Sequence, residues 1–598
     1  MTRHGEKAAR SVSPAVVALA AAAFLITSAL RPPEIHPVSR AALGLLAPVA
    51  VLACIAAWDA ARARFASAAP VLAVCAAFLA ANGWLGLQPH GSIVAAERIA
   101  LAGAAFFVFR EFTRGDGEGP DAGRFPARSV GLLLLASIGC ASALVALWQK
   151  AHGLEAIASA VRGSDLPFRE EMLARVDSGR VFGTVLLPGS LAGLLSLSLP
   201  ATVSLALGAA ARRTSKALVI AMACVQVAAL ILTGSVAGMA ALALAAAATA
   251  WTTAARRRIR LAVTAAVCLA GAAVLAGTIA SRGFDWRTLS DPAHPAGQRL
   301  GNWIVAGRML AERPILGGGG GAYAALYPLY RREGMNESRH AHNSYLEMAV
   351  EYGPLALPVI LVLAMAVLGR WRAACRASPA MAVACAGLPA FLLHNLVDFT
   401  AYQPGILIPC AALAGIAWDA GVGWGDRQDR ATTAGAMENG LRGPVASRMR
   451  MAAILACAAA AAFLAAHAVA DGAGGILADR ADDQLRRGDV ESGIASLRLA
   501  GRLCPANPAP PGTLAAVLVA RGRPAEALEH ARRARALDPC SARAEYLLGS
   551  ALLRTGEFTR AYVHLARASD LYPLDETYRE VSEEMERRLT GMRNGSGR

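Results

Sequence analysis

The sequence contains little charge for its length. Only 17% of its 598 residues are Asp, Glu, Lys or Arg, whereas 55% are hydrophobic, and the mean hydropathy is +0.42. A soluble globular protein of this size would carry far more charge. Alanine-, leucine- and valine-rich runs recur from Pro14 to Ala470, and many are long enough to cross about 30 Å of hydrocarbon. The scarcity of charge therefore excludes a soluble protein and indicates a polytopic, all-α membrane protein.

The cysteines form neither a disulfide framework nor a metal-binding pattern. Nine of the eleven lie within or beside apolar segments, where we expect small buried hydrophobic residues. The other two, Cys504 and Cys540, fall in the polar C-terminal part, and the sequence leaves open whether they pair. Because the chain has no CxxC pair and no local Cys/His cluster, we expect no metal site and no cofactor.

A signal-peptide cleavage site is also absent. The apolar run Ala15–Leu30 follows three basic residues, but no small-x-small site precedes Arg31, so we expect an uncleaved first span. The apolar segments predict about 12–13 transmembrane helices. The candidate spans are 14–30, 41–58, 67–87, 92–109, 129–149, 183–209, 217–233, 235–252, 261–280, 354–369, 378–396, 405–419 and 451–470.

Basic residues are concentrated in alternate loops. The loops at 256–260 and 370–376 are rich in arginine, whereas 88–92 and 397–404 contain no Lys or Arg. This distribution fits the positive-inside rule with a cytoplasmic N-terminus. Residues 471–598 contain 19 arginines and 18 acidic residues, so almost all of the net charge of +16 belongs to the membrane part. The charge therefore reflects topology and does not indicate nucleic-acid binding.

The C-terminal tail has a period of 34 residues. Proline, glycine, leucine and small residues recur at this spacing in three successive units. The pattern resembles the tetratricopeptide repeat, whose stacked helix pairs offer a concave surface to a protein partner. The alternative is a helical spacer with accidental alanine periodicity. The repeating positions are Pro505, Pro539 and Pro573; Gly488, Gly522 and Gly556; Ala500, Ala534 and Ala568; Gly493, Ala527 and Ala561; Leu503, Leu537 and Leu571.

Two long loops, 150–182 and 281–353, fall on the outer side. In the second, residues 317–321 are five glycines, but no Lys-Ser/Thr follows them, so a phosphate loop is not expected. A flexible turn with positive φ is the main interpretation, and a backbone cradle near a phosphate is the alternative. Arg299 and Arg308 would lie on one amphipathic helix, where each arginine is either an interfacial residue or a ligand contact.

Several blocks of the sequence together resemble the O-antigen ligase and polymerase-related superfamily. The most specific block is "HAHNSYLE", which follows "RPILGGGGG". Others are "RLGNWIVAGRM", "LLHNLVDFTAYQPG", "GRVFGTVLLPGSLAGL" and "LILTGSVAGMAALAL". The resemblance covers about residues 10–420. It implies a metal-independent, inverting glycosyltransferase of the bacterial inner membrane, which moves a glycan from undecaprenyl diphosphate to an acceptor hydroxyl on the periplasmic side.

The resemblance also implies roles for particular residues. His342 takes the position of the catalytic histidine, and Arg299 and Arg180 take arginine positions that hold the diphosphate. Where the family usually has Ser-Arg, this chain has Ser235-Val236. Either another arginine, such as Arg180 or Arg308, takes over that contact, or the donor is bound differently. The other candidate substrate-binding residues are His340, Asn343, Tyr345, His394 and Asp398.

The chemistry of these residue types agrees with the implied reaction. Guanidinium groups stay charged and bind phosphate oxygens in pairs, so they suit a diphosphate leaving group beside lipid. A histidine titrates near neutral pH and can draw the proton from an acceptor hydroxyl. For His340, His342 and Asn343 the alternative is a polar helix cap, and for His394 and Asp398 it is a polar pair at a helix end.

The expected domains follow from these observations. Residues 1–420 form the ligase-like membrane domain with the large periplasmic loop 281–353, 421–450 a cytoplasmic linker, 451–470 a final transmembrane helix, and 474–592 the periplasmic repeats. The sequence does not distinguish a ligase that acts on the lipid A core from a polysaccharide polymerase or a protein O-glycosylating enzyme. A transporter or a non-enzymatic scaffold is the alternative from another class.

Overall fold

The protein is described here from a computed structural model, which places residues 14–30, 36–57, 86–114, 127–163, 169, 173, 176–185, 187–208, 213–254, 256–282, 291, 294–418 and 444–595. Within these ranges the regular secondary structure is helical and contains no strand. The chain divides into two compact units, which are described separately. The first comprises Met1–Val74, Arg98–Phe284 and Ile360–Ala462, and the second comprises Cys75–Glu97, Asp285–Val359 and Phe463–Arg598.

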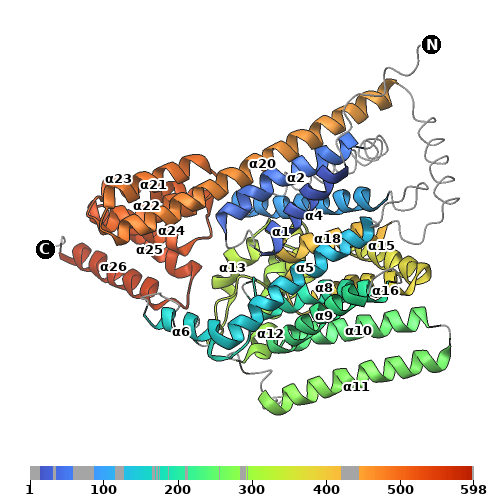
Figure 1. Ribbon diagram of the computed structural model, residues 1–598. Helices are drawn as coiled ribbons and strands as arrows, with labels where there is room; N and C mark the ends of the chain where they lie inside the picture. Colours follow the sequence, from blue (N-terminus) through green and yellow to red (C-terminus); the bar gives the residue numbers. More distant parts are fainter. Residues whose placement is uncertain are drawn as a thin grey trace, which may run out of the picture. The chain divides into compact units, whose positions relative to one another are not determined.

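The first unit is built around helix α8 (Pro188–Leu207). Fourteen of its residues are buried, and it packs against α5 (Ala127–Trp148) and α9 (Arg213–Thr233) (Figure 1). A helix that is covered on all sides needs apolar side chains on all sides, which explains its sequence "PGSLAGLLSLSLPATVSLAL". Its hydroxyl groups are satisfied locally, because Ser196 donates to the carbonyl of Ala192 at 2.7 Å and Thr202 to that of Ser198 at 2.9 Å.

Further helices complete the membrane part. Helix α5 continues through a π-helical turn, Gln149–Gly153, into α6 (Leu154–Arg162). The others are α1 (Pro14–Leu30), α2 (Pro37–Ala57), α4 (Pro89–Arg114), α10 (Val236–Thr253), α11 (Arg257–Arg282), α15 (Ala356–Ala377), α16 (Pro379–Cys385), α17 (Gly387–His394), η3 (Thr400–Tyr402) and α18 (Pro404–Trp418).

Seven of the described helices are long and apolar enough to cross a membrane. The chain is therefore a multi-pass membrane protein, as its composition predicts. Shorter apolar helices lie in other predicted spans, and most of the predicted span 67–87 lies outside the described residues. The seven helical stretches are Pro89–Thr113, Ala127–Arg162, Pro188–Leu207, Thr214–Thr233, Val236–Thr253, Ala356–Ala377 and Met451–Arg486.

The predicted span 378–396 is divided into two helices, α16 and α17. Pro389 has no N–H to donate, and its ring would clash with the carbonyl of Cys385 in a continuous helix. The helix accordingly stops at Cys385 and restarts at Gly387, which lies against the backbone of Leu197 in α8. Gly387 allows this close approach, because a Cβ atom there would lie 3.0 Å from the Cα atom of Leu197.

The last apolar helix, α20 (Pro444–Arg486), is 43 residues long. It contains the predicted transmembrane segment 451–470 and continues without interruption into the first helix of the repeats. The interval 471–473, where the sequence suggested a boundary, therefore lies inside one helix. Asp471 in this interval is buried and accepts a hydrogen bond from the amide of Asn507 at 2.8 Å.

The second unit contains the repeats and three short helices of the long loop 281–353. Helices α12 (Pro295–Glu312), α13 (Ala322–Tyr330) and α14 (Ser344–Tyr352) enclose a small apolar core that includes Val305, Met309 and Tyr323. The repeats follow α20 as α21 (Val490–Leu503), α22 (Ala509–Ala520), α23 (Pro524–Leu537), α24 (Ala542–Arg554), α25 (Phe558–Leu571) and α26 (Glu576–Gly595).

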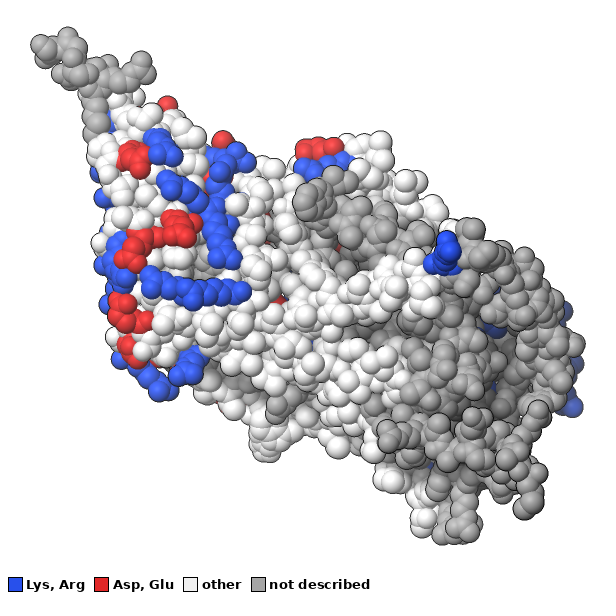
Figure 2. Space-filling view, turned by 90° about the horizontal axis from the view of Figure 1, so that it is seen from above, with Lys and Arg blue, Asp and Glu red and all other residues white. Residues whose placement is uncertain are grey.

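The repeat period predicted from the sequence is confirmed by the helices. Gly488, Gly522 and Gly556 all have positive φ and end a helix in each pair. At each site the glycine N–H bonds three residues back and the next N–H five residues back, which is the Schellman motif. Alanines 500, 534 and 568 are buried where helices meet. Figure 2 shows Lys, Arg, Asp and Glu side chains interspersed over the repeats.

Candidate active site

The loop before α14 contains the two histidines of the HAHN motif. Asn343 is the N-cap of α14, and its Oδ1 atom accepts hydrogen bonds from the backbone N–H groups of Tyr345 and Leu346, each at 3.1 Å. Such a cap satisfies N–H groups at the start of a helix that no helical carbonyl reaches. Asn343 thus fixes the start of α14, and its NH₂ group is the part that a substrate could engage.

His342 has an unusual backbone conformation. Among the described non-glycine residues, it is the one with positive φ, at 53°. A left-handed conformation costs an L-residue about 1 kcal/mol and persists only where its surroundings hold it. The indole Nε1 of Trp303 donates to the carbonyl of His342 at 3.4 Å, and the imidazole is half-buried. The fold thus holds a strained backbone at the histidine that the sequence identifies as the catalytic candidate.

A buried carboxylate holds the same loop from the other side. Glu347 is 1% exposed; its Oε1 atom lies 2.8 Å from Nδ1 of His340, and its Oε2 atom accepts from the N–H of Ala341 at 2.8 Å. A buried carboxylate is costly unless polar groups compensate its charge. Nδ1 of His340 and the N–H of Ala341 provide this compensation for Glu347. Ser338 also donates to the carbonyl of His340 at 2.7 Å. His340 therefore helps to fix the position of His342.

Arg299 lies one helical turn before Trp303 on α12. It falls on the stripe of α12 that continues through the buried residues Asn302 and Ala306. Its Nε atom is buried and makes no hydrogen bond to any described residue. A buried guanidinium nitrogen without a protein acceptor is costly, and a phosphate oxygen would satisfy it. Arg299 is therefore near the residue that contacts His342 and is suited to bind an anion.

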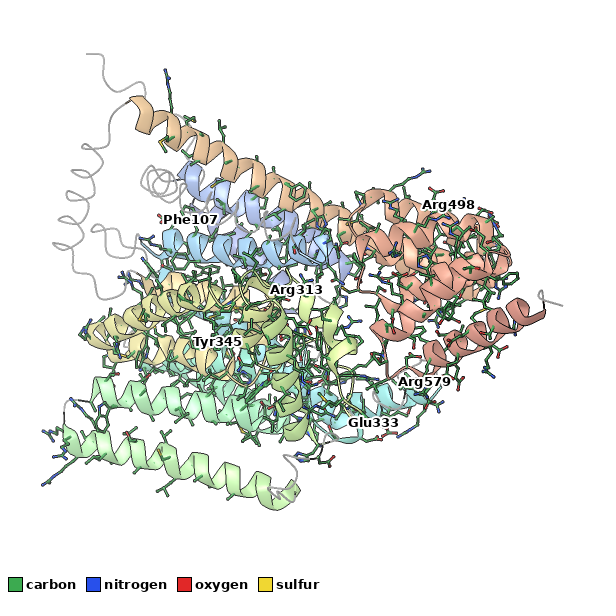
Figure 3. All side chains as sticks on the ribbon, turned by 180° about the vertical axis from the view of Figure 1, so that it is seen from behind. Phe107, Arg313, Glu333, Tyr345, Arg498 and Arg579 are labelled. Atoms are coloured by element: carbon green, nitrogen blue, oxygen red, sulfur yellow. The ribbon has the colours of Figure 1, made fainter. Side chains whose placement is uncertain are left out.

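Arg308 is placed differently from Arg299. The two arginines are nine positions apart, about half a turn around the helix, and Arg308 lies on the exposed side with Ile304 and Gly307. The structure therefore does not bring Arg308 to the Arg299 side of α12. Tyr345, labelled in Figure 3, lies in the first turn of α14 directly after the cap and is half-buried.

The five-glycine segment is a packing junction. The N–H groups of Gly318 and Gly319 donate to the carbonyls of Val350 and Glu351 at 2.9 and 2.8 Å. Those of Gly320 and Gly321 donate to Ser92 Oγ at 3.1 Å and to Glu351 Oε1 at 2.7 Å. These four N–H groups already have protein acceptors, so the segment does not offer them to a phosphate. Positive φ at Gly317, Gly319 and Gly321 agrees with the expected turn, but the segment is held in place by its contacts.

Glycine is required at this junction for steric reasons. Gly317 has φ of 67°, and a Cβ atom there would lie 2.5 Å from the carbonyl oxygen of Glu351. A Cβ atom at Gly353, where φ is 79°, would lie 2.0 Å from the carbonyl oxygen of Ile315. The glycines thus allow the chain before α13 to lie directly on the end of α14.

Two buried tyrosines support α12 from below the loop. The hydroxyl of Tyr327 donates toward Oδ1 of Asn302 at 2.9 Å, and that of Tyr323 to the carbonyl of Asn302 at 3.3 Å. Burial raises the pKa of Tyr327 to about 12 and raises the pKa of Tyr323 further. Both phenols therefore stay neutral donors at physiological pH. Asn302 in turn donates to Ser338 at 3.3 Å, which connects this network to the HAHN loop.

Arg180 lies in the first unit, at the end of the first long outer loop. Its Nε atom donates to the carbonyl of Thr233 at 2.7 Å. Thr233 is the last residue of α9, three positions before Val236. The following segment is fixed by Gln149, whose Oε1 accepts from the N–H of Gly183 at 2.8 Å. The guanidinium of Arg180 is thus held next to the position where the family arginine is missing.

His394 and Asp398 form a buried pair in the first unit. His394 is fully buried, and its Nε2 atom lies 3.4 Å from Oδ2 of Asp398. Asp398 also accepts from the N–H of Phe399 at 2.8 Å. Glycines provide the space, because a Cβ at Gly193 would lie 3.3 Å from Nδ1 of His394. This geometry matches the polar pair at a helix end and places both groups in the interior of the bundle.

The repeats contact the outer loop within the second unit. Tyr572, just after α25, donates a hydrogen bond to Glu337, and the guanidinium of Arg331 lies 5.0 Å from the centre of its ring. Glu337 and Arg331 belong to the segment that leads to His340. Sequence reasoning did not detect this contact, because the residues are far apart in the chain and only the fold brings them together.

Sequence reasoning also missed the roles of Glu347 and Trp303. Glu347 is the last residue of the block "HAHNSYLE", and its spacing seven residues after His340 was the one signal for a contact across the first turn of α14. Nothing in the sequence indicates that the indole of Trp303 reaches the carbonyl of His342, since the two are 39 positions apart.

Two family models match the chain. Residues 217–361 match the family described as O-antigen ligase, and residues 518–582 match the tetratricopeptide repeat. The first match contains Arg299, His340 and His342, whereas Arg180 and His394 lie outside it. No curated protein matches the chain. The two matches confirm the resemblances inferred from the sequence.

Proposed function

Because the chain carries an O-antigen ligase domain and a tetratricopeptide-repeat tail, we propose that it transfers a glycan from undecaprenyl diphosphate to an acceptor hydroxyl at the periplasmic face of the bacterial inner membrane. The observation that carries the proposal is the arrangement around His342. Its strained backbone is held between the Glu347 carboxylate and Trp303, one helical turn from Arg299.

In the proposed reaction His342 is the general base. Its imidazole accepts the proton of the acceptor hydroxyl while that oxygen attacks the anomeric carbon of the donor sugar. The bond from this carbon to the diphosphate oxygen breaks on the opposite face, so the configuration inverts. The base contributes about 10²–10⁴-fold in rate. His340 and Glu347 act as positioning residues, because they hold the loop and need not touch the sugar.

Arginines bind the negative charge that develops on the departing diphosphate. Arg299 is one of them, because its buried Nε lacks a protein acceptor among the described residues. Arg180 replaces the arginine that the family has at the position of Val236, because it is held at the end of α9 next to that position. Preorganised donors of this kind usually supply the largest electrostatic contribution to catalysis.

Arg308 provides the matched control for the arginine assignment. Full-length protein in detergent is incubated with lipid-linked oligosaccharide, and released undecaprenyl diphosphate is measured. We expect Arg299→Ala and Arg180→Ala to lose at least about tenfold in rate, and Arg308→Ala to stay near wild type because its side chain is exposed on the far side of α12. Equal losses in all three, or none in Arg299→Ala, would refute the assignment.

The acceptor is identified by the product of the same assay. Transfer to lipid A core oligosaccharide indicates a ligase, and elongation of lipid-linked chains indicates a polymerase. Glycan on a periplasmic serine indicates protein O-glycosylation. A scaffold or a transporter would release no undecaprenyl diphosphate with any acceptor, which would overturn the proposed enzymatic function.

A further inference from the structure

A cluster of metal-binding side chains lies in the second unit, away from the HAHN loop. His90 is in the first turn of α4, His467 is in α20, and Cys504 directly follows α21. One ligand atom from each residue lies within 4.8 Å of the other two. The three positions are far apart in the sequence, which explains why the cysteine spacing gave no indication of a metal site.

The geometry points to a zinc-type site, and we propose that His90, His467 and Cys504 bind one Zn²⁺ ion. The Sγ atom of Cys504 lies 3.5 Å from Nε2 of His467. Two ligands at Zn–S and Zn–N distances of about 2.3 and 2.05 Å in tetrahedral geometry are separated by about 3.6 Å. The observed separation therefore already matches two ligands of one zinc ion.

The surroundings orient the ligand atoms. Oε1 of Glu97 lies 2.5 Å from Nδ1 of His467, so Nε2 is the atom directed toward Cys504. This is the carboxylate–histidine–metal arrangement, in which an outer carboxylate fixes the tautomer and strengthens the ligand. Nε2 of His90 lies 3.8 Å from Asp471, so we assign Nδ1 of His90 as its ligand atom by the same rule.

The type of metal follows from the donor atoms. One thiolate and two imidazoles favour Zn²⁺ over Mg²⁺ or Ca²⁺, which bind oxygen ligands. A water molecule would complete the tetrahedron. The contacts from Glu97 to His467 to Cys504 could also suggest a cysteine nucleophile activated by a histidine. However, Cys504 is 1% exposed, and a second imidazole, that of His90, lies next to His467. A buried thiol with a third ligand suits a structural metal better than attack on a substrate.

The proposed ion would join three separate segments. It would link the start of α4, the outer part of α20 and the end of the first repeat unit, all within the second unit. Metal binding would thus stabilise the unit that carries the HAHN loop without taking part in glycan transfer. The inference does not depend on the proposed function, since the cluster contains none of the residues assigned to catalysis.

Metal content tests the site directly. Full-length protein, purified without a polyhistidine tag, is incubated with zinc sulfate, separated from excess metal and analysed by elemental mass spectrometry. We expect about one zinc per chain, and loss of it in Cys504→Ser, His467→Ala and His90→Ala. Cys540→Ser is the matched control, because this second repeat cysteine is outside the cluster and should leave the stoichiometry unchanged.

Two further measurements keep the test sharp if a variant folds poorly. Cobalt-loaded wild-type protein should show a thiolate-to-cobalt charge-transfer band that is absent in Cys504→Ser. Glu97→Gln should keep the stoichiometry at saturating zinc and weaken zinc binding by about 10–100-fold, as expected for a positioning residue. A wild-type protein without zinc, or Cys504→Ser with the wild-type zinc content and cobalt spectrum, would overturn the proposal.

Discussion

At the scale of single residues, the account depends on how the HAHN loop fixes one imidazole. Asn343 ends the loop with a helix cap, Glu347 holds His340 and the N–H of Ala341, and Trp303 holds the carbonyl of His342. Each contact orders the backbone on either side of His342. The positive φ of that residue is the result of these contacts acting together.

Glu347 should support glycan transfer mainly by accepting hydrogen bonds that hold the HAHN loop, and its negative charge should contribute less. Glu347→Gln can still accept from the N–H of Ala341, whereas Glu347→Ala leaves that buried N–H without a partner, at a cost of about 1–3 kcal/mol. We expect the rate of glycan transfer to fall much further in the alanine variant than in the glutamine variant. Glu333→Ala, at an exposed position of the same outer loop, is the control. Equal activities for the glutamine and alanine variants would contradict this role.

Residue types in the HAHN block predicted part of the local structure, whereas the role of His342 stays a prediction. The motif singled out His342 and allowed for the cap at Asn343. The helical period also places Arg299 and Arg308 on opposite sides of α12, and this separation could have been predicted from the sequence. The contact of Arg180 with Thr233 could not be predicted from the sequence, because the two residues are 53 positions apart and only the fold brings them together.

At the scale of elements, the repeat turns depend on glycine. Gly488, Gly522 and Gly556 have φ between 72° and 85°, and a substituent there would meet no neighbouring atom. The cost of Gly→Ala is therefore purely one of backbone conformation, about 1 kcal/mol per site. We expect each single variant to lower the melting temperature of the full-length protein, and the triple variant to lower it further.

Gly591→Ala is the matched control for these turns. Gly591 lies inside α26 with no neighbouring atom in the way, and alanine has the higher helix propensity. The melting temperature should stay the same or rise slightly. A fall as large as that of Gly522→Ala would contradict the attribution of the effect to the left-handed turn. The 34-residue period predicted these turns from the sequence, because local chemistry alone determines them.

Elements whose ends are set by packing were less predictable. The composition predicted one span over 378–396, whereas Pro389 divides it into α16 and α17. The expected domains leave residues 471–473 between the last transmembrane helix and the repeats, and α20 runs through these residues to Arg486. In both cases apolar composition predicted a helix but not the residue at which that helix ends. For α16 the end depends on Pro389.

At the scale of the whole molecule, the repeats should influence the HAHN loop. Tyr572 contacts Glu337 and Arg331, which lie just before His340 in the chain. Tyr572→Ala removes both contacts, and we expect faster amide hydrogen exchange across residues 331–342 together with a lower rate of transfer. Tyr562→Ala, on α25, is the control. Unchanged exchange in Tyr572→Ala would show that the repeats do not order the loop.

The central claim is that His342 acts through its imidazole, and a single-turnover measurement tests it most directly. His342→Asn and His342→Gly keep residue types that tolerate the left-handed backbone but remove the base. The account predicts that both variants transfer glycan about 10²–10⁴-fold more slowly than the wild type. His152→Ala, an exposed histidine outside the site, should be unaffected. A single-turnover rate for either His342 variant close to that of the wild type would contradict the claim, because only the backbone conformation would then matter.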